Sequence, residues 1–202
     1  MPARTAWVPA GNEICRRYRF KEIKLGLEKI LFLDIEASSL DRGSFPIEIG
    51  WIANTGHEES YLIRPEAGWK DWSIEAETLH GITRAHLEAE GLQASEVAER
   101  FVAAAENRQL VSDAPDFDRA WLDRLLSIIG RRAPKISFAQ AVWGEAIRNR
   151  LDPDAPRNEQ IIVAQQLLKE AMQHVGYEEP RHRALADAKA LWQVWRHLGM
   201  CG

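Results

Sequence analysis

The chain of 202 residues is predicted to form an α/β domain with a mixed, five-stranded sheet flanked by helices. Short apolar runs with β-branched residues come early and are separated by turn signals, which predicts an antiparallel start to the sheet. Later strand-like runs alternate with helical segments, which predicts a parallel finish covered by helices. With 46% hydrophobic and 28% charged residues, the composition is that of an ordinary globular protein.

The predicted strands are short apolar runs. The first, residues 29–36 (KILFLDIE), has the length and composition of a buried strand. Residues 45–65 contain the next two strands, on either side of a turn signal at residues 54–56. The fourth and fifth strands are expected within residues 108–114 and 134–140.

Helices are predicted where apolar residues recur at helical spacing between proline and glycine breaks. One helix covers residues 115–130, with Pro115 at its start and Gly130 as its stop. A tryptophan-rich loop is expected between the third strand and residue 94. The other predicted helices are residues 94–106, 141–150, 157–176 and 183–198.

Residues 1–28 are predicted to be an appendage to a domain that spans residues 29–202. The appendage is locally basic, so it could be an extra element packed on the domain, a loose tail or an arm that grips nucleic acid. Cys15 and Cys201 lie near opposite ends, which excludes a disulfide scaffold and fits a cytoplasmic location. No apolar run approaches the roughly 20 residues that span a bilayer, and no secretory signal is expected at the start, so no membrane partner is expected.

Asp34 and Glu36 come at the end of the first predicted strand, where side chains two residues apart share a face. Two carboxylates on one face repel each other and lose hydration beside an apolar run. A divalent cation would remove both penalties. Taken alone, the pair could equally be two acids at a solvent-exposed strand end.

Asp118 lies on the apolar stripe of its predicted helix, because it precedes Trp121 by three residues and Leu122 by four. Asp116 and Asp123 fall on the solvated side of the same helix. A carboxylate on the core face needs a partner, which could be a metal ion or a buried salt bridge.

His182 and Asp187 are five residues apart and would diverge on one continuous helix. Pro180 indicates that the helix begins near residue 183, so His182 can lie on the preceding loop and Asp187 one turn inside the helix. Both side chains could then approach one centre. A capping or surface role for His182 is the alternative.

Four carboxylates and one imidazole, with no thiolate, form a donor set that favours a hard cation, Mg²⁺ or Mn²⁺. Two such ions about 3.5–4 Å apart can activate a water molecule and stabilise the leaving oxygen in phosphodiester cleavage. The net charge of −4 argues against tight, non-specific duplex binding, but it agrees with acidic residues that two divalent cations would neutralise.

The segments FLDIEASSL, FDRAWL and HRALADA resemble, in this order, the three exonuclease motifs of the DEDDh (DnaQ-like) 3′–5′ exonuclease superfamily. LHGIT at residues 79–83 resembles a further segment that members carry between the first two motifs. The resemblance covers about residues 29–198. It implies the ribonuclease H-like fold of RNase T, oligoribonuclease and polymerase proofreading subunits.

By this resemblance, Asp34, Glu36, Asp118 and Asp187 would hold two metal ions, with Asp34 bridging them and Asp118 acting partly through water. His182 would be the general base that takes a proton from the attacking water. An imidazole suits that task because it ordinarily titrates near neutral pH.

The resemblance also implies contacts with the substrate. Leu40 and His80 stand where family members touch the terminal nucleotide, and the backbone of Ala37, Ser38 and Ser39 would meet the 3′-hydroxyl. Many members have Thr-Thr-Gly where this chain has Ala-Ser-Ser; the serines can still offer hydroxyls, but the loop without glycine is stiffer.

Asp113 is a second departure, because many members have asparagine at that position. The extra acid could be a turn former or could disturb metal binding. Neither departure removes a metal ligand, so activity is expected.

Together these features predict a metal-dependent 3′–5′ exonuclease that hydrolyses phosphodiester bonds at single-stranded 3′ ends and releases nucleoside 5′-monophosphates. RNA is slightly preferred over DNA, by analogy with stand-alone domains of this size. Two alternatives stay open: a DNA proofreading or repair exonuclease that acts with a polymerase, and an inactive ribonuclease H-like interaction module. The oligomeric state also stays open, with a homodimer as one alternative.

Overall fold

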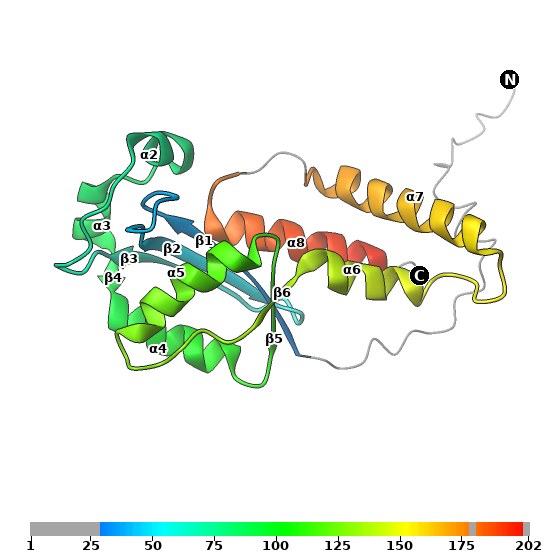
Figure 1. Ribbon diagram of the computed structural model, residues 1–202, viewed down its shortest axis with the longest axis horizontal. Coiled ribbons are helices and arrows are strands. Elements are labelled where there is room, and N and C mark those ends of the chain that lie inside the picture. The colour runs from blue at the N-terminus through cyan, green and yellow to red at the C-terminus, as the bar shows by residue number, and fades with distance from the viewer. Residues whose placement is uncertain (1–28, 178–180, 200–202) are drawn as a thin grey trace, which may run out of the picture.

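The strands of the sheet follow the order β4-β3-β2-β1-β5-β6 in the computed structural model, which describes residues 29–177 and 181–199 (Figure 1). β1 pairs antiparallel with β2 and β2 antiparallel with β3, whereas the β1–β5 and β5–β6 pairs are parallel. The predicted antiparallel start and parallel finish are therefore confirmed. The predicted appendage and both cysteines lie outside the described residues.

Most strands lie where the sequence predicts them: β1 Ile30–Ala37, β2 Pro46–Ala53, β3 Glu58–Arg64, β5 Gln109–Ser112 and β6 Ile136–Phe138. The predicted total of five was wrong, because a sixth strand, β4 at Leu92–Gln93, pairs in parallel with the end of β3. Two residues are too few to carry an alternating pattern, so only the pairing with β3 defines this strand.

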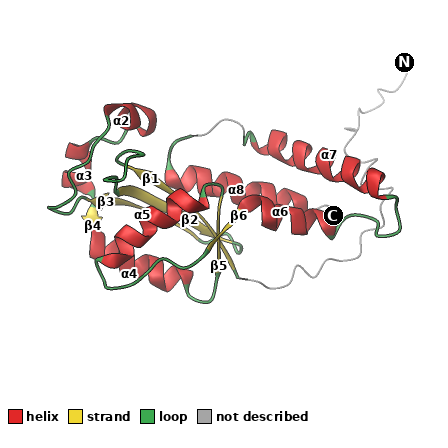
Figure 2. Cartoon of the chain, in the orientation of Figure 1, coloured by secondary structure: helices red, strands yellow, loops and turns green. Residues whose placement is uncertain are grey.

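The predicted long helices are confirmed (Figure 2), with the bounds α4 Ala94–Ala105, α5 Pro115–Ser127, α6 Ala139–Arg148, α7 Arg157–Val175 and α8 Ala184–Gly199. Within the described residues, no helix combines the length and the apolar character needed to cross a membrane.

The segment predicted as a loop before α4 contains two further helices, α2 Ile74–His80 and α3 Arg84–Glu90. Each follows a capping hydroxyl: Ser73 Oγ accepts the Ala76 N–H at 3.2 Å, and Thr83 Oγ1 accepts the His86 N–H at 3.1 Å. These caps stabilise the first turn. Each helix is only 7 residues long, so neither carries an apolar stripe long enough to be recognised in the sequence.

The side chains of β1 alternate between two cores, as the two-residue period of a strand requires. Leu31, Leu33 and Ile35 join a core with side chains of α4 and α5. Ile30 and Phe32 join a second core with side chains of α6, α7 and α8. The sheet is thus covered by helices on both faces (Figure 1).

Asp34 and Glu36 continue the row that Ile30 and Phe32 begin, so their side chains emerge on the face that α8 covers. The partner of Asp34 on β2 is Gly50. A Cβ atom on Gly50 would lie only 2.2 Å from the backbone nitrogen of Leu185. The missing side chain therefore lets α8 begin directly on the sheet, beside the acidic end of β1.

Candidate active site

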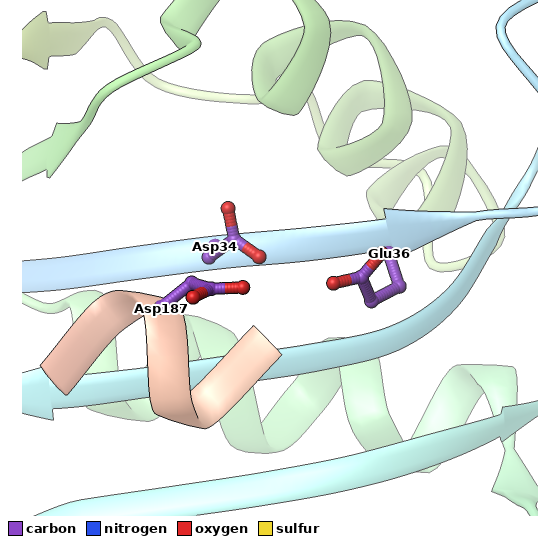
Figure 3. Close-up of side chains that lie close together, drawn as sticks. All are labelled: Asp34, Glu36 and Asp187. Atoms are coloured by element: carbon purple, nitrogen blue, oxygen red, sulfur yellow. The ribbon is translucent and has the colours of Figure 1, made fainter. Parts of the chain in front are cut away.

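Three carboxylates meet where β1 ends and α8 begins (Figure 3). Asp34 and Glu36 come from β1, and Asp187 comes from the first turn of α8. One carboxylate oxygen of each lies within 4.8 Å of the others. The structure thus brings together residues from near the start and near the end of the described chain, as the motifs predicted.

A second group of carboxylates shares Asp34 with the first. It consists of Asp34, Asp113 and Asp118, whose oxygens also lie within 4.8 Å of one another. Asp34 is therefore common to two groups, each of which could hold a cation. This arrangement agrees with the bridging position that the family resemblance implies for Asp34.

Asp118 lies in the first turn of α5 and is only 1% exposed. Its carboxylate accepts a hydrogen bond from the Ser112 hydroxyl. Among the described residues, no ion pair includes Asp118, so the buried salt bridge considered as its alternative role is not seen.

The other acids of α5 face away from the site. Asp116 is exposed, and Asp123 pairs with Arg132 at 2.9 Å and accepts the Ala133 N–H at 3.0 Å. The predicted helical phase, with Asp118 alone on the core side, is confirmed.

His182 lies on the loop that precedes α8, as the proline break predicted. It lines a cleft of about 370 Å³ together with Asp34, Glu36, Asp113 and Asp187. Its backbone has a φ of 50°, which a residue with a side chain seldom adopts. The loop must therefore hold His182 in place by other contacts.

Asp187 supplies part of that restraint. One of its carboxylate oxygens accepts the Arg181 N–H at 3.0 Å, and the other accepts the Arg183 N–H at 3.3 Å. Both neighbours of His182 are thereby tied to the first turn of α8. Each carboxylate oxygen keeps a lone pair that could bind a cation.

The electrostatics of the cleft favour a bound cation. Burial, and then repulsion from Asp118 and Glu36, raise the pKa of Asp34 well above its ordinary value. Burial, followed by the charges of Asp187 and Glu48, raises the pKa of Glu36 to about 7. The pKa of Asp118 is also raised, chiefly by burial. Crowded oxygen ligands of this kind fit divalent cations, which favour their ionised forms.

The residues expected to meet the substrate lie around the end of β1. Ser38 and Ser39 are buried, and both hydroxyls donate to Asp71, the Ser38 bond being 3.4 Å long. Leu40 is 78% exposed beside this braced loop. The serine hydroxyls are thus engaged within the protein, which makes the loop rigid.

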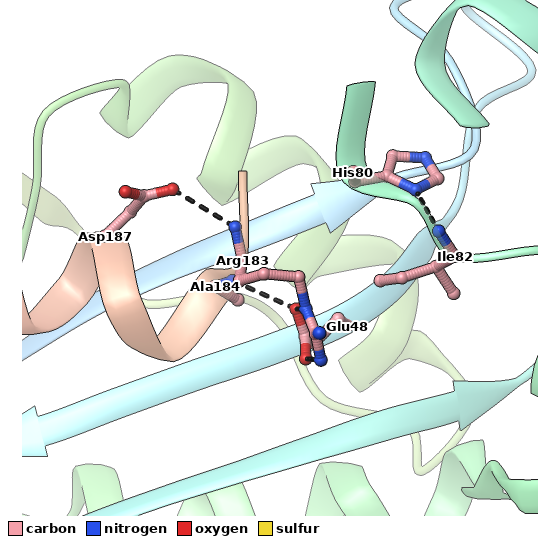
Figure 4. A network of polar contacts seen from close by, with 6 residues as sticks. All are labelled: Glu48, His80, Ile82, Arg183, Ala184 and Asp187. Carbon is pink, nitrogen blue, oxygen red and sulfur yellow. Dashed lines mark hydrogen bonds and ion pairs between the residues drawn. The ribbon is translucent and has the colours of Figure 1, made fainter. Parts of the chain in front are cut away.

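His80, at the end of α2, is only 6% exposed. Its Nδ1 accepts the Ile82 N–H at 3.0 Å (Figure 4), so a neutral ring carries its proton on Nε2. That Nε2 is buried and has no hydrogen-bond partner among the described residues. An unpaired buried donor is energetically costly.

Several residues of the site were not recognised in the sequence. The Tyr177 hydroxyl donates to Asp113 Oδ2 at 3.1 Å, and its ring packs edge-on against Trp143. Tyr177 therefore holds the carboxylate of Asp113, the residue at which many family members have asparagine. Glu48, on β2, is 3% exposed and stands opposite Glu36. Neither belongs to a recognised motif, and each acquires its position only from strand pairing or helix packing.

A family model described as exonuclease, of the RNase T type, matches residues 31–195. The chain belongs to this exonuclease family. A search of curated proteins found no match.

Solved structures of exonuclease I share the fold of this family member. The zinc-bound complex of the Escherichia coli enzyme with single-stranded DNA is 18% identical, with a TM-score of 0.57, and the match covers 82% of this chain and 39% of that one. A second exonuclease I structure is 16% identical, with a TM-score of 0.58, covering 84% of this chain and 41% of that one. The E. coli enzyme bound to a dA16 oligonucleotide is 15% identical, with a TM-score of 0.58, and the match covers 84% of this chain and 41% of that one. This chain thus spans about two fifths of those proteins, and the likeness confirms the ribonuclease H-like fold.

Proposed function

We propose that this exonuclease-family chain removes nucleotides from single-stranded 3′ ends in a metal-dependent reaction and releases nucleoside 5′-monophosphates. The observation that carries the proposal is the position of Asp34, which belongs to two carboxylate groups at once, beside His182 in one cleft. A phosphodiester placed there would meet both groups of ligands and the imidazole together.

Asp34, Glu36, Asp118 and Asp187 are the proposed ligands of two divalent cations, Mg²⁺ or Mn²⁺. When bound, such cations would lower the pKa of the attacking water and stabilise the leaving oxygen. Asp118 is buried and held by Ser112, so it offers its oxygen from a fixed position. Asp187 is half-buried and held by backbone N–H groups.

His182 is the proposed general base. His182 lines the same cleft as Asp34, Glu36 and Asp187, so its imidazole is proposed to accept a proton from water at the phosphodiester. Only the neutral imidazole can do so, which predicts a loss of rate at acidic pH.

The substrate end is proposed to lie beyond Glu36. The backbone of Ala37, Ser38 and Ser39 would face the 3′-hydroxyl. The exposed Leu40, and His80 at the end of α2, would contact the terminal nucleotide.

RNA is our slight preference as substrate, by analogy with RNase T and oligoribonuclease. DNA is the second candidate, because exonuclease I structures of the same fold contain single-stranded DNA. DNA proofreading with a polymerase is a narrower form of that candidate. The cytoplasmic location and a homodimer stay predictions.

Matched RNA and DNA oligonucleotides, labelled at the 5′ end, test the proposal with EDTA, Mg²⁺ or Mn²⁺. We expect products shortened stepwise from the 3′ end, none with EDTA, and activity restored by either cation. Asp118→Asn should nearly abolish turnover, whereas Asp116→Asn on the solvated side of α5 should not. Full activity after rigorous chelation, or shortening from the 5′ end, would overturn the proposal. No cleavage of either polymer would favour the interaction module.

A further inference from the structure

Glu48 is a buried carboxylate that belongs to none of the exonuclease motifs. It lies on β2, opposite Glu36 on β1, and is only 3% exposed. It accepts hydrogen bonds from Arg183 Nε at 3.1 Å and Nη2 at 2.7 Å, and from the backbone N–H of Ala184 at 3.0 Å (Figure 4). One side chain on the sheet thus binds both the residue before α8 and the first residue of α8.

The residue that this contact secures is His182. Its own backbone is in the left-handed region, with a φ of 50°, so the loop would relax if its flanks were free. Arg183, directly after it, is held from two sides, because its side chain binds Glu48 and its N–H binds Asp187. Carboxylates from the sheet and from α8 therefore fix the same loop residue.

The contact between the sheet and α8 is close at this point. Gly50, two residues after Glu48, leaves no room for a Cβ atom beneath Leu185. The start of α8 therefore rests on β2, and Glu48 fixes it there through a planar, two-bonded ion pair.

Glu48 is better explained as a support than as a cation ligand. Its carboxylate already receives three hydrogen bonds from protein donors. Neither group of closely spaced acids in the described part of the chain includes it. The ion pair also differs from a surface pair, because one partner is almost fully buried.

We infer that the Glu48–Arg183 ion pair is a positioning device that holds His182 over the carboxylates of the cleft. This inference rests on the proposed function, in which His182 is the general base. Its two residues act through His182 and touch no reacting atom.

Kinetics of Glu48→Gln and Arg183→Lys test the inference. Glutamine keeps an acceptor but loses the charge, and lysine keeps the charge but loses the planar fork. We expect each to lower kcat by roughly 10- to 100-fold, the usual effect of removing a support behind a functional group, with KM unchanged. Arg183→Lys, which leaves every charge in place, should also leave the Mg²⁺-induced rise in Tm unchanged. Arg183→Lys should keep more activity than Arg183→Ala.

The neighbouring pair Lys189–Glu58 provides a matched control. It also joins α8 to the sheet, at 2.8 Å. Its acid, Glu58, is on β3 rather than β2, and its base, Lys189, does not adjoin His182 in the chain. Lys189→Ala and Glu58→Gln should keep wild-type kcat. If they lose as much activity as Glu48→Gln, the effect is general anchoring of α8 and the inference is overturned.

A double variant separates positioning from stability. If Glu48 acts only through His182, the double variant Glu48→Gln/His182→Ala should have the same kcat as His182→Ala alone. A multiplicative loss would overturn the inference.

NMR of the six histidine rings supplies a readout that needs no catalysis. The His182 signals should shift or broaden in Glu48→Gln and Arg183→Lys, while those of His57 and His86 should not. Suppose that the wild-type protein shows no cleavage, yet these substitutions shift or broaden the His182 signals. The proposed function then fails and the positioning inference stands. If wild-type protein is active and both kcat and the His182 signals survive the substitutions, the positioning inference fails alone.

Discussion

The two faces of the β1–β2 ladder are made from alternating residues of the same strands, yet they serve different purposes. The face toward α4 and α5 is apolar along its length, with Leu31, Leu33 and Ile35 on β1. The face toward α8 is apolar only at first, with Ile30 and Phe32, and then carries Asp34 and Glu36. One face is a complete core, and the other changes from core to candidate active site within one strand.

This difference indicates how the fold tolerates its site. Carboxylates that are crowded and partly desolvated oppose folding unless a cation or a proton neutralises them. The α4–α5 face and the far half of the α8 face supply the burial that offsets this opposition. The site is therefore built where two cores already fix both strands.

Asp34→Asn should produce the largest effect, because Asp34 is common to both carboxylate groups. If the cations no longer stabilise the transition state, the loss of several kcal/mol corresponds to a roughly 10³-fold fall in turnover. Without cations the variant should be more stable than wild type, since repulsion from Asp118 and Glu36 is removed. Steady-state kinetics and melting curves with and without Mg²⁺ measure both effects; equal Mg²⁺ shifts in the two proteins would place the cation elsewhere.

Leu33→Ala tests the opposite face of the same strand. Leu33 is fully buried, so the free energy of unfolding should fall by about 2–5 kcal/mol. Turnover per folded molecule and the Mg²⁺ response should persist. Denaturant titration and kinetics well below the Tm check this; a lost Mg²⁺ response in folded Leu33→Ala would show that the two faces are not independent.

Gly50→Ala should break the contact between β2 and the start of α8. The added methyl group would meet the backbone of Ala184 and Leu185, and overpacking of this kind lowers stability by about 1–3 kcal/mol. Gly68→Ala is the matched control, because no atom outside Gly68 and its two chain neighbours lies within 4 Å of its Cβ position. Similar melting temperatures for both variants would contradict the close approach.

The last expected effect is on the pH dependence of the cation-free protein. The pKa of Glu36 is raised to about 7 from an ordinary 4.5, so its protonated form is favoured in the folded state. The resulting stabilisation is complete below about pH 4.5 and is lost as the pH rises through about 7. Glu36→Gln should therefore flatten this part of the profile and, at pH 8 in EDTA, be more stable than wild type. If Glu36→Gln were less stable than wild type at pH 8 in EDTA, repulsion between Glu36 and its neighbouring carboxylates would be contradicted.

Much of the fold could be predicted because it is recorded in local patterns. The alternation of β1 and the apolar stripe of α5 reflect which side chains are buried, so Asp34, Glu36 and Asp118 could be assigned to faces. Pro180 placed His182 before the last helix. The motifs then identified the site carboxylates as a set.

What the sequence could not supply are features that depend on segments distant in the chain. α2 and α3 are each 7 residues long, and β4 has two residues defined by its pairing with β3, so their local signals were too weak. Tyr177 meets Asp113, and Glu48 meets Arg183 across 135 positions, only because helices pack on a particular strand order. The sequence by itself determined which side chains are buried and which acids are candidates for the site, since neighbouring residues record burial. Only the tertiary structure decided which of them meet, since a hydrogen bond or an ion pair between distant segments leaves no periodic trace in either one.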